Sequence, residues 1–319
     1  MVNPSYEIKP KIVVIGGPTG IGKTELSLKL AETFHGGIVS ADSMQIYRFM
    51  DIGTAKPGPV ERKRALHFMI DVADPDEPYD AARFAGEARD CIAELTGRGM
   101  LPFVIGGTGF YINALLYGLC EARPASAEIR KQLRRELEIS GSCVLYERLA
   151  DCDPEAAGRI HPNDSYRVIR ALEVYQLTGQ PMSAYQQAHG FQELPFDALK
   201  ICLTIDREIL YARINQRVDE MLSQGLLAEV RELLEKGYSA ELNSMKSIGY
   251  RHMADYIQGR LDWEEAVSLM KRDTRRYAKR QLVWFRKDPG FKWMAPGDTA
   301  AIEAEIREFL ARDTHEVKV

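Results

Sequence analysis

The cysteines of this sequence show no pattern of pairing. There are five, an odd number, and no two of them form a C-x-x-C pair. The six histidines are scattered as well, so the sequence offers no zinc module. This usage is typical of reduced, mostly buried thiols in a cytosolic protein. The cysteines are Cys91, Cys120, Cys143, Cys152 and Cys202.

The sequence also has no targeting or membrane-spanning segment. Residues 1–7 contain no apolar signal region, and no apolar run approaches the roughly 20 residues that a bilayer-spanning helix needs. There is no internal repeat or low-complexity stretch. We therefore expect a soluble, cytoplasmic protein with no membrane contact, and nothing in the sequence implies a stable protein partner.

An overall excess of positive charge is absent too. The formal net charge is -4, with 28% charged residues, so a nucleic-acid site would have to gather its basic residues locally. Hydrophobic residues make up 45% of the 319, which is ample for a buried core. The length suggests two domains, or one large domain with an insertion.

Short β-branched runs alternate with helical patterns in the first part of the chain. Strands are predicted at 11–16 (KIVVIG), 37–41 (GIVSA), 67–72 (HFMIDV), 101–105 (LPFVI) and 200–205 (KICLTI), and helices at 23–34 and 81–95. This alternation predicts an α/β fold with a parallel sheet of the P-loop NTPase type, flanked by helices.

The pattern changes near residue 123. Strand-like runs vanish until residue 200, and helical periods occupy 127–139, 144–151 and 166–177. We therefore predict a mostly helical insertion domain at 123–196. The catalytic core then comprises 1–122 and 197–319, with C-terminal helices at 209–235, 263–270 and 271–286.

A glycine-rich loop follows the first predicted strand and precedes the first helix. It matches the phosphate-loop pattern G-x-x-x-x-G-K-[ST], in which backbone N–H groups and the helix dipole bind an anion. Lys23 would reach the phosphate charge, and the Thr24 hydroxyl would join an Mg²⁺ shell. Kinases, NTPases and some transferases share this loop, so it does not identify the anion. The loop residues are Gly17, Pro18, Thr19, Gly20, Ile21, Gly22, Lys23 and Thr24.

Two other strand ends carry candidate residues. Asp42 follows the second strand, where ligands of open α/β sheets bind, so its carboxylate could accept a proton or hold Mg²⁺ through water. The alternative is that Asp42 only caps the helix that follows. The fourth strand is followed by Thr108 instead of the Mg²⁺-binding Asp of motor NTPases, which argues against ATP hydrolysis. Thr108 could donate to a phosphate oxygen or belong to a plain turn.

Basic residues cluster late in the chain. Six of them at helical spacing would form one positive stripe suited to a phosphate backbone, or a solvated face paired within the helix with Asp273. They are Lys271, Arg272, Arg275, Arg276, Lys279 and Arg280. Two further stretches, 159–170 and 246–252, mix basic, aromatic and amide side chains, as single-stranded RNA sites do.

The motifs together resemble one family, the bacterial tRNA dimethylallyltransferases, also called tRNA isopentenyltransferases. The matching stretches run in family order over nearly the whole chain. They are GGPTGIGKT (16–24), SADSMQIY (40–47), DIGTAKP (51–57), GGTGFYINALLYGL (106–119), HPNDSYRVIRALEVYQLTGQP (161–181) and KSIGYRH (246–252).

The resemblance implies a reaction. A dimethylallyl group would move from dimethylallyl diphosphate to the exocyclic N6 amine of the adenosine 3′ to the anticodon of a tRNA. The phosphate loop and Mg²⁺ would then stabilise diphosphate as the leaving group. The insertion would hold the anticodon stem-loop, and the target base would leave its stack.

The resemblance also implies roles for individual residues. Asp42 matches the catalytic base, Thr108 a residue near a diphosphate oxygen, and Arg217 an arginine that closes over the diphosphate. Without the family, Arg217 would be taken for a helix-surface charge. The tRNA-contacting stretches match Asp42, Ser43, Met44 and Gln45; Tyr166, Arg167, Val168, Ile169 and Arg170; and Lys246, Ser247, Ile248, Gly249, Tyr250 and Arg251, with Arg130 as an additional candidate.

Three alternatives stay open at this point. An adenylate isopentenyltransferase would use AMP as acceptor and would need neither the insertion nor the basic patches. A P-loop nucleotide kinase would consume ATP. A non-catalytic tRNA-binding protein would have no use for the intact Lys23, Thr24 and Asp42.

Overall fold

The computed structural model describes residues 9–119, 126–190 and 194–312. Cys120 and the predicted domain boundary at 122–123 lie outside these ranges. The chain divides into two compact units, the first formed by Met1–Leu116 and Leu194–Val319 and the second by Tyr117–Glu193. In the described part of the chain, no helix is both long and apolar enough to cross a membrane.

A parallel sheet forms the centre of the first unit. Its described strands lie in the order β3-β2-β4-β1-β5-β6, and each strand pairs with its neighbours in parallel. The central position of β1, between β4 and β5, places the glycine-rich loop in the middle of one sheet edge. The strands are β1 Lys11–Gly16, β2 Gly36–Ser40, β3 His67–Phe68, β4 Leu101–Gly106, β5 Asp197–Leu203 and β6 Lys292–Met294.

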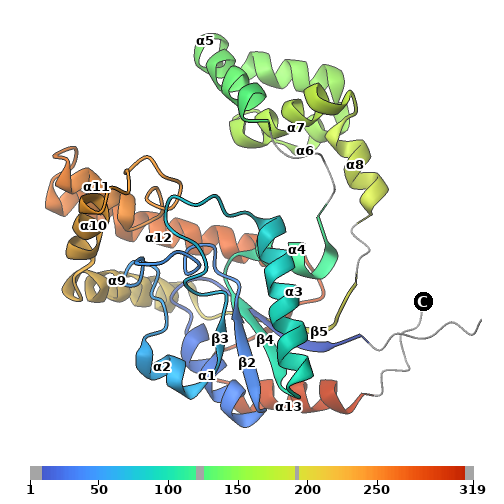
Figure 1. Cartoon of the computed structure of the whole chain (residues 1–319), viewed down its shortest axis with the longest axis vertical. Helices are drawn as coiled ribbons and strands as arrows, with labels where there is room; N and C mark the ends of the chain where they lie inside the picture. Colours follow the sequence, from blue (N-terminus) through green and yellow to red (C-terminus); the bar gives the residue numbers. More distant parts are fainter. Residues whose placement is uncertain (1–8, 120–125, 191–193, 313–319) are drawn as a thin grey trace, which may run out of the picture. The chain divides into compact units, whose positions relative to one another are not determined.

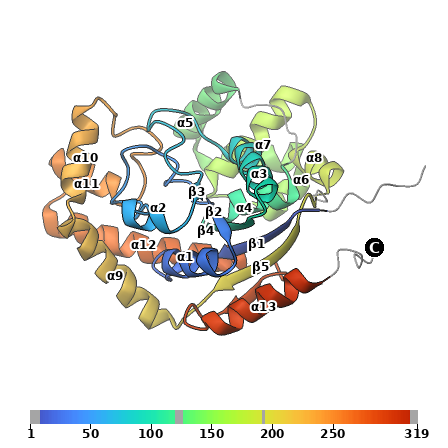
Figure 2. The ribbon, with the colours of Figure 1, turned by 60° about the horizontal axis from the view of Figure 1, so that its bottom comes forward.

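Helices cover both faces of the sheet, which confirms the predicted α/β fold (Figures 1 and 2). On one face, Val13 and Ile15 pack in a core with residues of α1, α9 and α13. On the other, Leu95 of α3 fills the space beside Gly37. The helices of this unit are α1 Lys23–Thr33, α2 Pro59–Arg64, α3 Ala81–Gly97, α4 Gly109–Tyr117, α9 Arg207–Ser223, α10 Leu226–Glu235, α11 Tyr250–Ile257, α12 Trp263–Phe285 and α13 Thr299–Ala311.

The second unit is helical in its described residues. Its core contains Leu133 and Leu149 of α5 together with Val168 and Leu172 of α7, all at most 1% exposed. The two helical periods predicted at 127–139 and 144–151 join into α5 across a non-helical Gly141. The helices are α5 Ala127–Cys152, α6 Pro154–Arg159, α7 Ser165–Thr178 and α8 Met182–His189.

Four predicted elements were wrong in extent. The strand predicted at 67–72 is only His67–Phe68, because Met69 and Asp71 have φ angles of 63° and 58°, which a strand cannot contain. The helix predicted at 209–235 is divided at Gly225, whose φ is 103°. The helices predicted at 263–270 and 271–286 form the single helix α12. Sequence reasoning missed β6 and α13 altogether.

Candidate active site

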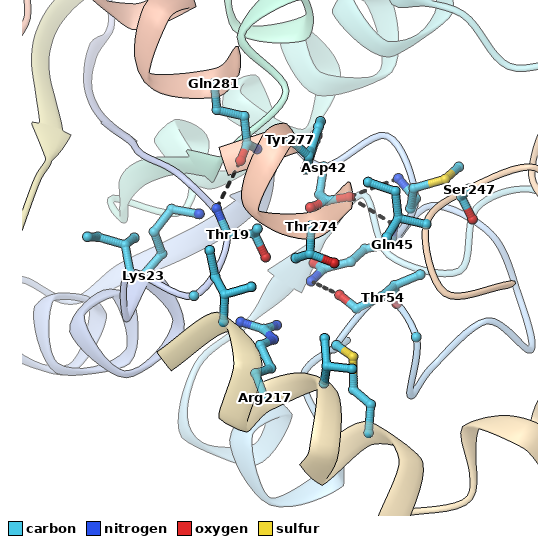
Figure 3. A pocket seen from close by; sticks show the side chains of 18 of the residues that line it. Thr19, Lys23, Asp42, Gln45, Thr54, Arg217, Ser247, Thr274, Tyr277 and Gln281 are labelled. Carbon is cyan, nitrogen blue, oxygen red and sulfur yellow. Dashed lines mark hydrogen bonds between the residues drawn. The ribbon is translucent and has the colours of Figure 1, made fainter. Parts of the chain in front are cut away.

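A cavity of about 570 Å³ lies at the edge of the sheet where the strands end. The phosphate loop after β1 and the segment after β2 form one side of it. Residues of α9, α12 and the segment 246–250 contribute the remaining lining. All the lining residues belong to the first unit. Figure 3 shows Lys23, Asp42, Arg217 and Tyr277 arranged around this space.

The phosphate loop has the curled backbone that anion binding requires. Gly20 and Gly22 have φ angles of 78° and 102°, which side chains disfavour. The Lys23 ammonium donates to the carbonyl oxygens of Gly17 and Pro18, each at 2.9 Å. Helix α1 begins at Lys23, so its first N–H groups have no partner within the helix. The loop therefore offers an ammonium and helix N-terminal amides to an anion.

The charge of Lys23 depends on its neighbours. The pKa of Lys23 is lowered to about 8, chiefly by burial; the nearby carboxylate of Asp42 opposes this shift and the guanidinium of Arg217 adds to it. A bound polyanion would favour the protonated ammonium in the same way as Asp42 does. The site is therefore poised to take up a proton, or to retain one, when an anion binds.

Asp42 has two structural roles at once. Its Oδ1 accepts hydrogen bonds from the N–H groups of Met44 at 2.8 Å and Gln45 at 3.4 Å. These bonds cap a turn at 43–46, whereas the alternative interpretation expected a helix after Asp42, and the structure has no helix there. The same carboxylate also lines the cavity with Lys23 and Arg217. Capping therefore does not compete with a chemical role, because it fixes the carboxylate at the cavity wall.

Thr108 ties two strand-end loops together. Its Oγ1 accepts from the N–H of Ser43 at 3.0 Å and donates to the Ser43 hydroxyl at 3.3 Å. Thr108 is not among the residues that line the cavity. These bonds fix the loop that carries Asp42, and a bond from the Thr108 hydroxyl to a phosphate oxygen stays a prediction.

Arg217 lies in the wall of the cavity and not on an outer helix surface. Burial lowers the pKa of its guanidinium, against the opposing effect of Asp42 and Glu220. Two polar contacts from α12 reach α9 on either side of it. Arg275 donates to Asn215 at 2.6 Å, and Lys271 pairs with Asp219 at 2.6 Å. Arg217 is thereby placed on a helix that α12 holds in position.

The basic stripe of α12 is largely engaged with the protein itself. Besides the contacts of Lys271 and Arg275, Arg272 and Arg276 pair with Asp273. Arg280 lies 5.7 Å from the ring centre of Tyr277 and reaches the cavity. Lys279 is exposed. The predicted stripe is therefore not a continuous row of free charges. Two of its six residues, Arg272 and Arg276, pair with Asp273, as the alternative interpretation expected.

Sequence reasoning missed the other face of α12. Met270, Thr274, Tyr277 and Gln281 follow one another at helical spacing and line the cavity. Burial and the negative charge of Asp42 raise the pKa of Tyr277, so its hydroxyl keeps its proton. The available signal was the uncharged face of an otherwise basic helix.

The predicted tRNA-contacting residues of the first unit have different environments. Lys246, Ser247 and Ile248 line the cavity, as do Ser43 and Met44. The side-chain amide of Gln45 also borders it, but bonds to Ser40, Thr54 and Ala55 already occupy that amide.

Tyr250 differs from its neighbours in the stretch 246–251. Its side chain is fully buried, and its hydroxyl donates to Glu229 at 2.5 Å. Tyr250 also borders the cavity, so a contact of this residue with RNA stays a prediction beside its structural role. Arg251 forms an ion pair with Asp273 and remains partly exposed, and the φ of 95° at Gly249 lets the chain enter α11.

The predicted RNA stretch of the second unit is divided in the same way. Val168 and Ile169 are 1% and 7% exposed and belong to the hydrophobic core, so their side chains are not available to a partner. Tyr166 is 74% exposed, and Arg167 is exposed as well. Arg130 and Arg170 both reach the buried carboxylate of Glu173 at 3.0 Å. On α7, the residues of this stretch that remain available to RNA are Tyr166 and Arg167 in the first turn and the partly exposed Arg170.

A preformed metal cluster is not part of the site. Within the described ranges, no three His, Cys, Asp or Glu side chains gather in a way that could hold an ion. Thr24 does border the cavity next to Lys23, and Asp42 lies on the same wall. These oxygen donors suit a hard cation that is held jointly by the protein and a phosphate.

Two family models match this chain. The model described as IPP transferase matches residues 45–288, and the model described as Isopentenyl transferase matches residues 10–71. A tRNA dimethylallyltransferase from Desulfosudis oleivorans is 56% identical over 90% of this chain and 91% of its own length.

Solved structures resemble the chain in fold as well. The full-length tRNA isopentenylpyrophosphate transferase from Bacillus halodurans is 39% identical, with a TM-score of 0.70 over 95% of this chain and 98% of its own. A eukaryotic dimethylallyltransferase, described as acting on tRNA, is 31% identical, with a TM-score of 0.78 over 94% of this chain and 77% of its own.

Proposed function

This chain belongs to the tRNA dimethylallyltransferase family, and we propose that it transfers a dimethylallyl group from dimethylallyl diphosphate to the N6 amine of the adenosine 3′ to a tRNA anticodon. The observation that carries this proposal is the joint placement of Lys23, Asp42 and Arg217 around one cavity. Two cations and a phosphate loop suit a leaving diphosphate, while a carboxylate suits an amine that must lose a proton.

The phosphate loop would stabilise the charge that develops on the leaving group. As the C1–O bond of the donor breaks, negative charge accumulates on the diphosphate, and Lys23, Arg217 and the amides at the start of α1 would bind it more tightly than the ester. The allylic carbon becomes cation-like and must be kept from water. Apolar side chains of the cavity wall, including Ile214, Val218 and Met221, would exclude solvent there.

Asp42 would accept the proton that N6 loses as its nitrogen bonds to the allylic carbon. An aromatic amine is a weak nucleophile, so alignment of N6 with the donor should supply much of the rate. The bonds from Met44 and Gln45 hold the Asp42 carboxylate in one orientation. Thr108, through Ser43, would act as a positioning residue for the same loop.

We also propose that Mg²⁺ binds with the diphosphate at Thr24. The hydroxyl of Thr24 and the carboxylate of Asp42 are hard oxygen donors on the same wall, which suits this cation. When bound, Mg²⁺ would neutralise part of the diphosphate charge.

We propose RNA contacts for each unit separately. In the second unit these are Tyr166 and Arg167, which would contact the anticodon stem-loop. In the first unit, Lys246 and Ser247 border the cavity that the flipped adenine would enter. We further propose that the helical domain at 123–196 serves this binding.

A competition experiment tests the proposal against its alternatives. The protein is incubated with labelled dimethylallyl diphosphate, Mg²⁺ and equal concentrations of AMP and an unmodified anticodon stem-loop. We expect the label to enter the RNA. Preferential labelling of AMP would indicate an adenylate isopentenyltransferase, and phosphoryl transfer from ATP without the allylic donor would indicate a kinase.

A further inference from the structure

Gln281 of α12 bridges the two glycine-rich loops at the sheet edge. Its Oε1 accepts a hydrogen bond from the backbone N–H of Thr19 in the phosphate loop at 2.9 Å. Its Nε2 donates to the carbonyl oxygen of Gly107, after β4, at 2.9 Å. The side chain is only 6% exposed. One amide group therefore joins the loop after β1 to the loop after β4, as Figure 3 shows for its contact with Thr19.

The glycines around Gln281 leave no space for side chains. A Cβ on Gly107 would lie 2.1 Å from Nε2 of Gln281. On the next turn of α12, Trp284 and Phe285 approach Gly109 and Gly16 so closely that a Cβ would come within 2.1 Å and 2.6 Å of their rings. Both loops are therefore glycine-rich partly because the last turns of α12 pack directly on their backbones.

The chemistry of the bridge requires an amide. The Thr19 N–H needs an acceptor and the Gly107 carbonyl needs a donor, and the two ends of Gln281 meet these needs in one orientation only. A carboxylate would place an oxygen against the Gly107 carbonyl, and an apolar side chain of the same length would leave both backbone groups buried without a partner. Glutamine is thus the residue that satisfies both loops.

The bridge also determines which amides can bind an anion. The N–H of Thr19 is directed to Gln281, Pro18 has no N–H, and the carbonyls of Gly17 and Pro18 accept from Lys23. The anion must then be held by the amides that follow Thr19 and by the first turn of α1. The loop conformation that exposes those amides depends on the Thr19 anchor.

We propose that Gln281 is a positioning residue for the phosphate loop, which sets the affinity of the site for the diphosphate part of the donor. This inference rests on the proposed function, since it assigns to that loop the binding of a diphosphate. Gln281 acts through Thr19 and Gly107 and has no assigned contact with the reacting atoms. Its expected effect is therefore on binding of the donor and not on binding of RNA.

Titration calorimetry with inorganic diphosphate and Mg²⁺ tests the inference. We expect Gln281→Met to weaken diphosphate binding by roughly tenfold or more, because a buried donor and a buried acceptor lose their partners. Gly107→Ala should reproduce this loss from the opposite side, since its Cβ would displace the amide. The Kd for the anticodon stem-loop should stay within about twofold in both variants. Gln258→Met, at an exposed glutamine, is the matched control.

Each outcome decides the matter. Unchanged diphosphate affinity in Gln281→Met overturns the inference, as does an equal loss of diphosphate and RNA affinity, which would indicate a general folding defect. If Gln281→Met does not fold, Gln281→Glu keeps the acceptor for Thr19 and should still weaken diphosphate binding; an unaltered Kd would overturn the inference. A wild-type protein that fails to bind diphosphate would instead overturn the proposed function itself.

Discussion

Lys23 and Asp42 face the same cavity from the carboxyl ends of β1 and β2, two strands that β4 separates in the sheet. The two charges influence each other, because the carboxylate of Asp42 raises the pKa of Lys23 against the effect of burial. Loss of either charge should therefore impair a reaction that needs an anion site beside a proton acceptor.

Asp42→Asn should separate the two roles of Asp42. Asparagine keeps an oxygen that can accept from Met44 and so preserves the local cap, but it cannot take up a proton as a carboxylate does. We expect single-turnover transfer to fall by roughly two orders of magnitude or more, with RNA affinity retained. If Asp42→Asn transfers normally while Asp42→Ala does not, Asp42 is only a cap.

The pH dependence of donor binding should report on Lys23. Its pKa of about 8 means that the free enzyme loses the ammonium proton as the pH rises through 8, whereas a bound diphosphate retains it. The KM for dimethylallyl diphosphate should therefore be flat below about pH 7 and rise above pH 8, by up to tenfold per pH unit. Initial rates across this range provide the measurement.

Lys23→Arg is the control for that profile. Arginine remains protonated throughout, so the rise above pH 8 should disappear even if the absolute KM increases. The donor is the same in both proteins, so its own ionisation cancels in the comparison. A variant that keeps the wild-type pH profile would show that another group titrates.

Tyr250→Phe should affect stability and not RNA recognition. The variant removes the hydroxyl that donates to Glu229, whose carboxylate also accepts from the backbone N–H groups of Asp51, Ile52 and Gly53. We expect the free energy of unfolding in urea to fall by about 1–3 kcal/mol. The folded variant should bind the stem-loop as the wild type does. Weaker RNA binding at unaltered stability would support the sequence-based prediction that Tyr250 contacts RNA.

Lys279 is the residue of the basic stripe best placed to meet RNA, since it is exposed while Lys271 is paired with Asp219. Lys279→Gln should weaken stem-loop binding and reduce the slope of log K against log salt by about 0.7 to 0.9. Lys29→Gln, at an exposed lysine of α1, should leave the slope unchanged. Equal slopes for Lys279→Gln and the wild type would show that Lys279 does not contact RNA phosphates.

The sequence was sufficient for the phosphate loop and for five of the six described strands, because these features are marked by patterns of neighbouring residues. Alternating strands and helices predict the sheet, and the spacing of Gly17, Gly22, Lys23 and Thr24 defines the loop. The early end of β3 after Phe68 was not predicted, because the positive φ angles at Met69 and Asp71 arise in the folded chain and have no glycine to signal them.

Contacts between distant segments limited what could be predicted about the site. Gln281 lies 262 positions from Thr19, so nothing local marks it as part of the phosphate site. Tyr250 lies in a stretch of basic, aromatic and amide residues that is typical of RNA sites, but its buried hydroxyl donates a hydrogen bond to Glu229, 21 positions away. The family resemblance located Arg217, whereas helix periodicity could not indicate which face of α9 borders the cavity.

Nucleoside analysis of the RNA product tests the central claim most directly. Wild-type protein and Asp42→Asn are each incubated with dimethylallyl diphosphate, Mg²⁺ and an unmodified anticodon stem-loop, which is then digested and examined by mass spectrometry. We predict that the wild type produces N6-dimethylallyladenosine at the position 3′ to the anticodon and that the variant produces almost none in the same time. Unmodified adenosine with the wild type, or equal modification by both proteins, would contradict the account.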